Sequence, residues 1–337
     1  MTHTSQAAGL GLPESPPIAS LDVRFLVDDA DYEPLAELIR TAHAHDGIPW
    51  LPTADNMRFT LRRDGMNPAH DVVLVEADGR LVAVIGVERE VRDDVPVYDV
   101  WGKVAPALRR RGIATWLVEW AIGRARQRAR AEDPRAEVQV GAHVDAEETG
   151  ARILFEGRGF RPVRHFFLMR RDSLDSVPDA PLPTGLDIRP VTPDQHRTIF
   201  GAENEAFRDH WGHRELDEEA FRQTFGQAET NTDLWVVAWD GDQVAGVVEN
   251  WIWPEENARL GVRRGWLERI SVRRPWRRRG LGRALTAASL VRLREAGMTE
   301  AMLGVDAENP SGALGLYEGL GFTVARRSAA YRRPLGR

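Results

Sequence analysis

Leu267-Glu-Arg-Ile-Ser-Val272 is followed without a break by Arg273-Arg-Pro-Trp276 and then by Arg277-Arg-Arg-Gly-Leu-Gly-Arg283. The first six residues have the composition of a β-strand, and the residues after Gly280 have the spacing of an amphipathic helix. Between them lies a turn rich in arginine and glycine. This strand–turn–helix unit predicts an α/β arrangement in which the glycines and arginines surround the start of the helix.

The turn has the chemistry of a pyrophosphate-binding site. Glycine lets the backbone approach a ligand closely, and the free N–H groups at a helix start attract anions. Arginine side chains add charge-assisted bonds to phosphate. Other interpretations fit less well: a Walker loop needs Gly-Lys-Ser/Thr, a dinucleotide fingerprint needs a third glycine where Leu285 stands, and a nucleic-acid site needs exposed aromatics beyond Trp276.

The chain also repeats itself. Each half contains an apolar strand, an Asp-Gly turn and a second apolar strand, which predicts a β-hairpin. Four segments of the first half return in the same order in the second half: 21–24 as 186–189, 71–83 as 233–245, 109–112 as 277–280, and 155–160 as 317–322. Four matches in one order predict two collinear copies of one domain.

The repeat sets the expected organisation of the 337 residues. Each copy is predicted to be an α/β (α+β) domain, with a mixed, mostly antiparallel sheet flanked by helices. We expect a disordered leader at residues 1–20, an N-terminal domain at 21–171, a linker at 172–185 and a C-terminal domain at 186–337. The linker assignment rests on its Pro, Asp and Ser content.

Composition excludes several classes of protein. The chain has no cysteine, which excludes disulfides, thiolate metal sites and a cysteine nucleophile. A net charge of −6 argues against a general nucleic-acid binder. No stretch reaches the ~20 apolar residues that span a bilayer, and the leader has no apolar signal region. We therefore expect a cytoplasmic protein with no metal, no membrane contact and no nucleic-acid partner, as a monomer or homodimer.

Two correctly spaced motifs resemble those of the GNAT superfamily of N-acetyltransferases. Arg277-x-x-Gly280-x-Gly282, after Val272 and Pro275, is similar to the acyl-CoA-binding motif of that family. Residues 305–322 are similar to its second motif. The resemblance covers the chain from about Leu21 to its end, and it implies two tandem GNAT-like domains that use acetyl-CoA as a co-substrate.

The resemblance also implies which residues contact the acyl-CoA. Backbone groups of Ile270 and Val272 would pair with the pantetheine arm, amides from Arg278 to Arg283 would hold the pyrophosphate, and Asn309 would contact the cofactor. The full set of expected contacts is Ile270, Ser271, Val272, Arg277, Arg278, Arg279, Gly280, Leu281, Gly282, Arg283 and Asn309 in the second copy, with Val104, Arg109, Arg110, Arg111, Gly112, Ile113 and Ala114 in the first.

Two residues are candidate catalysts. The resemblance implies that Glu268 deprotonates the attacking amine, directly or through water, and that Tyr317 protonates the departing thiolate. Elementary chemistry agrees, because an ammonium cannot attack a thioester and a thiolate leaves more readily beside an acid. Glu268 could equally be an exposed strand carboxylate paired with Arg269, and Tyr317 could be a core aromatic.

The first copy departs from the pattern. Ala114 replaces the second glycine, Glu148 stands in the place of Asn309, and Phe155 replaces Tyr317. We expect this copy to be catalytically weak or silent, although it could still bind CoA or shape the substrate cleft. A tandem protein whose first copy has lost these motif residues resembles the mycothiol synthase group, in which the C-terminal copy transfers the acetyl group. Trp266 departs from that group, which would offer a carboxylate there.

The expected function is transfer of acetyl from acetyl-CoA to a primary amine of a small molecule by direct attack. A non-catalytic acyl-CoA-binding or sensing protein, or an acetyltransferase of a peptide or protein amine, remains an alternative. His210 and Trp211 are candidate substrate contacts, since they end the first helical region of the second copy. A helix end packed on the core would explain them equally well.

Overall fold

The computed structural model describes residues 12–13, 16, 18, 21–62, 65–92, 95–133, 137–226, 230–309 and 312–335. Most of the leader expected at residues 1–20 therefore lies outside the described residues. The chain divides into two compact units, Met1–Val163 with Ser328–Arg337, and Arg164–Arg327. We refer to them as the N-terminal unit and the C-terminal unit.

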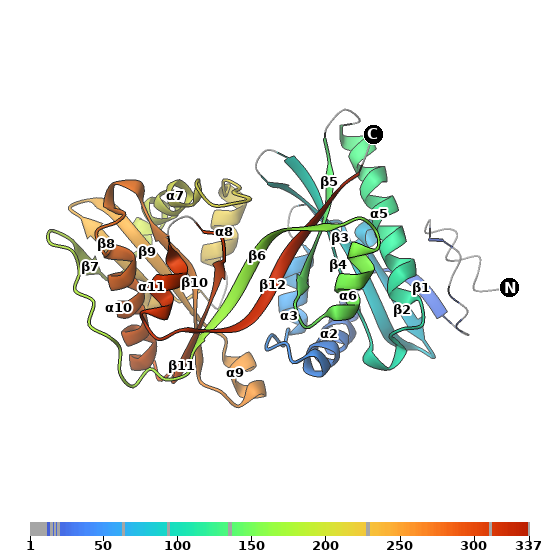
Figure 1. The fold of residues 1–337 in the computed structure, drawn as a ribbon, viewed down its shortest axis with the longest axis horizontal. Coiled ribbons are helices and arrows are strands. Elements are labelled where there is room, and N and C mark those ends of the chain that lie inside the picture. The colour runs from blue at the N-terminus through green and yellow to red at the C-terminus, as the bar shows by residue number, and fades with distance from the viewer. Residues whose placement is uncertain are drawn as a thin grey trace. The chain divides into compact units, whose positions relative to one another are not determined.

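The N-terminal unit is built on a sheet with the strand order β1-β2-β3-β4-β5-β12 (Figure 1). Neighbouring strands are antiparallel except β4 and β5, which are parallel. The strands are β1 (Leu21–Phe25), β2 (Val72–Ala77), β3 (Arg80–Arg92), β4 (Val95–Val104), β5 (Gln139–Asp145) and β12 (Thr323–Pro334), and the helices are α2 (Tyr32–Asp46), α3 (Ala54–Leu61), α4 (Pro68–Asp71), α5 (Ile113–Glu132) and α6 (Thr149–Glu156).

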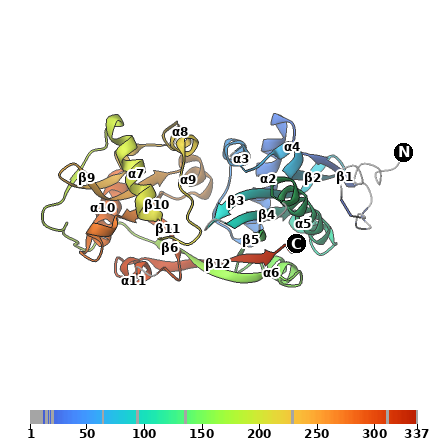
Figure 2. The ribbon, with the colours of Figure 1, turned by 90° about the horizontal axis from the view of Figure 1, so that it is seen from above.

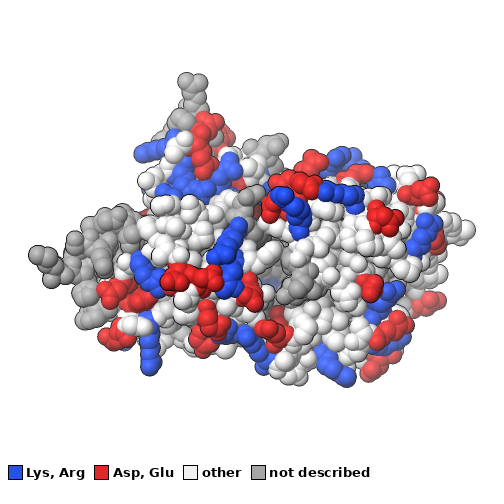
Figure 3. Space-filling model, turned by 180° about the vertical axis from the view of Figure 1, so that it is seen from behind, with Lys and Arg blue, Asp and Glu red and all other residues white. Residues whose placement is uncertain are grey.

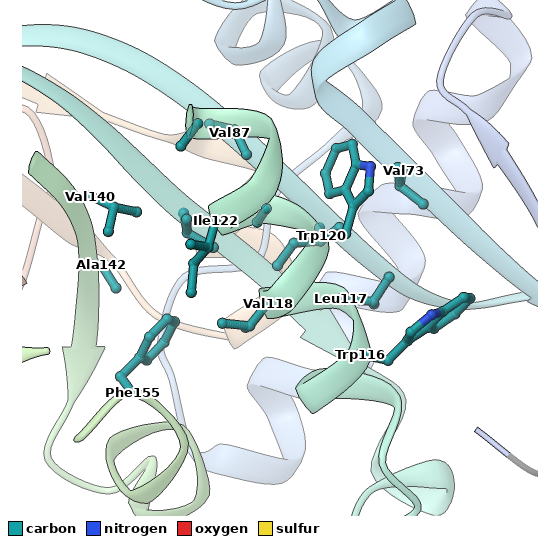
Figure 4. Packing of buried hydrophobic residues seen from close by; sticks show 14 of the residues in the cluster. Val73, Val87, Trp116, Leu117, Val118, Trp120, Ile122, Val140, Ala142 and Phe155 are labelled. Carbon is teal, nitrogen blue, oxygen red and sulfur yellow. The ribbon is translucent and has the colours of Figure 1, made fainter. Parts of the chain in front are cut away.

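Two cores cover the faces of this sheet. Successive strand side chains point to opposite faces, so Val73 of β2 joins the core beneath α5, and Leu74 joins the core beneath α2. Figure 4 shows Trp116 and Trp120 of α5 among the buried residues of the first core. The predicted hairpin is present, with both turn residues between β2 and β3 in the left-handed region, Asp78 at φ 50° and Gly79 at φ 71°.

The C-terminal unit repeats this plan with the strand order β6-β11-β10-β9-β8-β7. Here β10 and β11 form the parallel pair, and the other pairs are antiparallel. The strands are β6 (Arg161–Arg171), β7 (Asp187–Arg189), β8 (Val236–Asp240), β9 (Gln243–Ile252), β10 (Arg264–Val272) and β11 (Glu300–Asp306), and the helices are α7 (His196–Phe207), α8 (Glu218–Gly226), α9 (Pro254–Leu260), α10 (Leu281–Glu295) and α11 (Ala313–Glu318).

Helices α7 and α10 both pack on β9 and β10 (Figure 2). Alternate residues of β8 belong to different cores: Val236 and Ala238 lie in the core that contains α10, whereas Val237 and Trp239 lie in the core that contains α7. A mixed, mostly antiparallel sheet flanked by helices is thus present in each unit, and the fold class predicted from the sequence is confirmed.

The last strand of each sequence copy is exchanged between the units. Ser328–Pro334 of β12 pair with β5 in the N-terminal unit, and Phe166–Arg171 of β6 pair with β11 in the C-terminal unit. The N–H and C=O groups along a strand edge need partners, and the exchanged strands supply them for β5 and β11. The compact units therefore differ from the sequence halves by one edge strand each.

Basic and acidic side chains are interspersed on the face seen in Figure 3. Many of them form ion pairs, for example Arg164 with Asp306 at 2.7 Å and Arg273 with Glu205 at 2.7 Å. Among the described residues, no helix has the length and apolar character needed to cross a membrane.

Candidate active site

The site of the C-terminal unit begins where two parallel strands separate. Pairing between β10 and β11 ends at Leu267 and Leu303 among the described residues, so Glu268–Val272 have a strand partner only on the β9 side. The N–H of Arg273 donates to the carbonyl of Ala245 on β9 at 3.0 Å. Antiparallel strands alternate this pattern, so the backbone groups of Ile270 and Val272 face away from β9, as pairing with an extended ligand arm requires.

The loop after β10 has the backbone shape of an anion site. Arg278 and Gly280 both lie in the left-handed region, at φ 60° and φ 86°, and Gly280 is the N-cap of α10 with no side-chain cap. The first helical amides, from Leu281 to Arg283, have no partner within a helix. Alternating backbone conformations of this kind point successive N–H groups toward one anion.

Arg277 has a structural task in this loop. Its Nε donates to the carbonyl of Val272 at 2.8 Å, its Nη1 pairs with Asp209 at 2.6 Å, and its Nη2 donates to the carbonyl of Ala206 at 2.9 Å. These contacts tie the loop to the end of α7. Arg278 and Arg279 are exposed, and they are the side chains that a phosphate would meet.

Glu268 is the extra residue of a β-bulge. On β9, Asn250 pairs with Leu267 and Glu249 with Arg269, so Glu268 has no opposite residue of its own. Bulges re-aim side chains next to active sites. The Glu268 side chain is accessible to solvent, yet enough protein surrounds it that lost hydration raises its pKa to about 7, with the charge of Glu249 as the second cause. A carboxylate with this pKa can accept a proton near neutral pH.

Tyr317 lies on α11 and is only 6% exposed. Its ring meets Phe322 edge-on at 6.1 Å. Its hydroxyl makes no hydrogen bond within the described part of the chain, and burial raises the pKa of the phenol. The hydroxyl therefore keeps its proton at neutral pH and can donate it. Asn309, half-buried, ends a turn in which its N–H donates to the carbonyl of Asp306 at 3.1 Å.

His210 and Trp211 follow α7 directly after Asp209, the partner of Arg277. The His210 ring packs on Phe207 at 4.4 Å, and burial lowers its pKa, so it is neutral at pH 7. The Trp211 ring lies 6.0 Å from that of Phe166 on β6. Both residues are partly buried beside the loop, and no cluster of three His, Asp or Glu side chains that could hold a metal occurs among the described residues.

The N-terminal unit keeps the loop. Arg110 and Gly112 have left-handed backbones at φ 63° and φ 88°. Arg109 repeats the role of Arg277, because its Nε donates to the carbonyl of Val104 at 3.2 Å and its Nη1 pairs with Asp46 at 2.6 Å. The two copies therefore share a loop geometry that the sequence repeat predicted.

The features that the sequence predicts for catalysis are absent from the described residues of the same copy. β3 and β4 pair from Ala83–Val104 to Arg92–Val95 with no register shift, so this pair of strands has no bulge across those described residues. Val100 is the counterpart of Leu267, because it is the last residue of β4 that pairs with β5, as Leu267 is the last of β10 that pairs with β11, so β4 has no residue in the place of the inserted Glu268. Phe155 points into the core (Figure 4). Glu148, in the place of Asn309, is held by an ion pair with Lys103.

The leader contacts the loop of the N-terminal unit. The indole N–H of Trp116 donates to the carbonyl of Pro13 at 2.8 Å, and a Cβ added to Gly112 would lie 3.5 Å from the Cβ of Pro16. No atom lies within 4 Å of the same position at Gly280. Among the described residues, the second loop is thus open where part of the chain covers the first.

Sequence reasoning missed the bulge and a buried cluster beside it. Glu203 of α7 and Glu249 of β9 are 2% and 3% exposed, and both lie near Arg269. A signal was present, since Glu249 interrupts the apolar strand Gln243–Ile252. The partner of that glutamate could not be read from the sequence.

Comparisons with known proteins agree with this geometry. Residues 197–322 match the acetyltransferase (GNAT) family, and residues 68–162 match the acetyltransferase (GNAT) domain. The chain is similar to a mycothiol acetyltransferase of Frankia alni, at 30% identity over 94% of this chain and 95% of the relative. It is also similar to a mycothiol acetyltransferase of Geodermatophilus obscurus, at 28% identity over 91% and 96%.

Solved structures extend the likeness to the fold. A GCN5-related N-acetyltransferase from Sphaerobacter thermophilus superposes with a TM-score of 0.73 at 29% identity, covering 95% of this chain and 97% of that one. A tandem GNAT protein from the clavulanic acid biosynthesis pathway has a TM-score of 0.65 at 19% identity, over 94% and 99%, and it shares the fold. The chain therefore belongs to the GNAT family of acetyltransferases, as an N-acetyltransferase with two GNAT domains in tandem.

Proposed function

We propose that the C-terminal unit transfers the acetyl group of acetyl-CoA to the primary amine of a small molecule by direct attack. The observation that carries the proposal is Glu268, a solvent-accessible carboxylate with a pKa of about 7 at a bulge. It lies on the strand whose open edge leads into the anion-binding loop. The test is acetyl transfer by the purified protein to a library of small amines, followed as released CoA thiol.

Different residues of the C-terminal unit carry out the separate steps of the proposed acetyl transfer. The thioester supplies an activated acetyl group. The loop amides hold the pyrophosphate, and the open edge at Ile270 and Val272 aligns the extended arm. Glu268 accepts the proton that the ammonium must lose before its nitrogen attacks the thioester carbonyl. Tyr317 gives its phenolic proton to the sulfur as the carbon–sulfur bond breaks, which leaves an amide and a neutral thiol.

The support for a small acceptor comes from the relatives, which are named for mycothiol. Trp266 marks a difference from the expected pattern of that group, so the acceptor itself needs a direct assay. The mycothiol precursor amine, other small amines and a peptide amine form three arms of the amine screen. Transfer to the peptide alone would contradict the proposed acceptor class, and acetyl-CoA binding with no transfer in any arm would favour a sensing protein.

We also propose that the N-terminal unit is catalytically silent. Its loop has the right backbone, but β4 has no residue in the place of the inserted Glu268, and Phe155 replaces the proposed acid. Pro16 lies against Gly112 of that loop, and Glu148 is neutralised by Lys103. These features support a role in the architecture of the chain, including the strand that completes the other unit.

Activity is expected to rise with pH. Glu268 works as a base only when it is deprotonated, and its deprotonated fraction increases as the pH rises through its pKa of about 7. At saturating amine and acetyl-CoA, kcat should therefore fall by about tenfold for each pH unit below that value and level off above about pH 8. A kcat that stays constant from pH 5.5 to 8 would contradict the role of Glu268.

Tyr317→Phe is expected to lower kcat by about 10- to 100-fold, because the thiolate would leave without an acid in place. The hydroxyl has no partner in the described chain, and the ring contact with Phe322 is preserved. Folding and the KM for acetyl-CoA should hence change little. Steady-state kinetics with a thermal melt would check this, and an unchanged kcat would remove Tyr317 from the mechanism.

A further inference from the structure

Two buried glutamates lie next to the bulge that holds the proposed base. Glu203 of α7 and Glu249 of β9 are 2% and 3% exposed, and each carboxyl group affects the pKa of the other. One cation serves both, because the Nε of Arg269 lies 3.4 Å from Glu203 and 3.7 Å from Glu249. The indole N–H of Trp251 also donates to Glu249 at 3.3 Å.

The charges of this cluster balance only if the two carboxyl groups share a proton. One guanidinium can neutralise one carboxylate, and two adjacent buried carboxylates cannot both ionise readily. Burial is the largest cause that raises the pKa of each, and for Glu249 the negative charge of Glu203 adds to it. The proton belongs to the pair rather than to either residue.

The pair lies next to the bulge. Glu249 is the cross-strand partner of Arg269, and Glu268 is the inserted residue immediately before Arg269. The charge of Glu249 acts on Glu268, whereas Glu203 comes from α7 and meets Glu249 and Arg269. The position of the shared negative charge within the pair therefore changes the field at the proposed base.

We propose that the buried Glu203–Glu249 pair is a positioning element for the reaction, which fixes the protonation state of Glu268 through the negative charge that the pair shares over Arg269. This inference rests on the proposed function, in which Glu268 is the base. Glu203 and Glu249 do not themselves touch the reacting atoms. They set how tightly Glu268 holds a proton, and so the pH at which the amine can be deprotonated.

The charged neighbours are few. Glu249 faces Glu203 from α7, and Arg269 and Glu268 from β10. Glu268 faces Glu249 from β9 and Glu256 from α9, and Glu256 lies 3.7 Å from Arg264. Glu256 also has a pKa raised to about 7, mainly by burial. Both variants of the test leave Glu256 and Arg264 unchanged, so their influence is common to both.

Two isosteric variants separate a charge effect from a packing effect. Glu203→Gln leaves Glu249 as the sole carboxylate for Arg269, which places the full negative charge beside Glu268. Glu249→Gln removes that charge and leaves the negative charge on Glu203, whereas the charge that acts on Glu268 is that of Glu249. The acid limb of the kcat–pH profile is expected at higher pH in Glu203→Gln than in Glu249→Gln, with a separation of about one pH unit.

The acid limb of the wild-type kcat–pH profile should fall between those of the two variants or coincide with one of them. If Glu203 and Glu249 were only structural, both substitutions would lower kcat without moving the two limbs apart. The inference would be overturned if the acid limbs of the two variants lay at the same pH, or if the limb of Glu249→Gln lay at higher pH than that of Glu203→Gln.

A carboxyl titration keeps this test independent of catalysis. In unliganded protein labelled with ¹³C-glutamate, the Glu268 signal is assigned by its loss in Glu268→Gln, and its midpoint is followed in the two variants. The Glu268 midpoint is expected at higher pH in Glu203→Gln than in Glu249→Gln. If Glu268→Gln keeps full activity, the proposed base fails while the titration still tests the pair. If the midpoints coincide, the pair fails while the proposed base can stand.

Discussion

Gly280→Glu is expected to abolish acetyl-CoA binding at the C-terminal unit, with affinity reduced by about 100-fold or more. Gly280 has φ 86°, and apart from its chain neighbours no atom of the described residues lies within 4 Å of the position that its Cβ would take. The new carboxylate would enter the space where the loop amides bind an anion, with the wrong charge. Loss of two charge-assisted bonds of about 1.5 kcal/mol each corresponds to about 100-fold. Titration calorimetry with acetyl-CoA measures the change.

Two matched variants show what the loss means. Gly280→Ala imposes a Cβ on the same left-handed backbone without the charge, at a cost of about 1 kcal/mol, so it reports the effect of strain alone. Gly112→Glu makes the same change in the first loop, at φ 88°. If that loop is silent, Gly112→Glu leaves acetyl-CoA binding and turnover intact. Equal losses from both glutamate variants would contradict the asymmetry between the units, and unchanged binding in Gly280→Glu would exclude this loop as the pyrophosphate site.

Glu268→Gln is expected to lower kcat by about 100- to 1,000-fold, the usual contribution of a general base. The amide has nearly the shape of the carboxylate but cannot accept the ammonium proton. Because the side chain stands at the bulge and away from the loop, the Kd for acetyl-CoA should stay within about twofold. The acid limb of the kcat–pH profile should also disappear, since the group that titrates with a pKa of about 7 has been removed.

Glu295→Gln serves as the control for loss of one carboxylate. This residue is exposed at the end of α10, so its substitution should leave kcat, the acid limb and acetyl-CoA affinity at wild-type values. Stopped assays across pH 5.5–9 with both variants give the comparison. A Glu268→Gln enzyme with wild-type kcat and an unchanged acid limb would rule out Glu268 as the base.

Much of the geometry of the proposed cofactor-binding loop was predictable because it is local in the chain. The left-handed backbones at Arg278 and Gly280, the uncapped start of α10 and the strand before it belong to one contiguous segment. Glycine content and the strand–turn–helix pattern encode such a segment directly. The repeat then predicted the loop of the N-terminal unit at Arg110 and Gly112, which has the same backbone shape.

The distant pairings were not predictable in the same way. Simple alternation along a strand predicts that Glu268 shares a face with Ile270 and Val272. A bulge, however, depends on how β9 lines up with β10, and one extra residue changes that register. The exchange of β6 and β12 likewise depends on which unpaired edge each strand meets. Neither the bulge nor the strand exchange has a recognisable pattern in the sequence of the strands involved.

The sequence by itself determined the family motifs, the tandem repeat, the backbone shape of the proposed anion-binding loops and the loss of the proposed acid at Phe155, because each is a property of residue type at fixed local spacing. Only the tertiary structure decided that Glu268 stands at a bulge, that Arg277 anchors a helix, and that Glu203 and Glu249 share Arg269. The physical reason is that burial and charge pairing come from side chains brought together across the sheet, and the free energy of a buried carboxylate depends on those neighbours far more than on its own position in the chain.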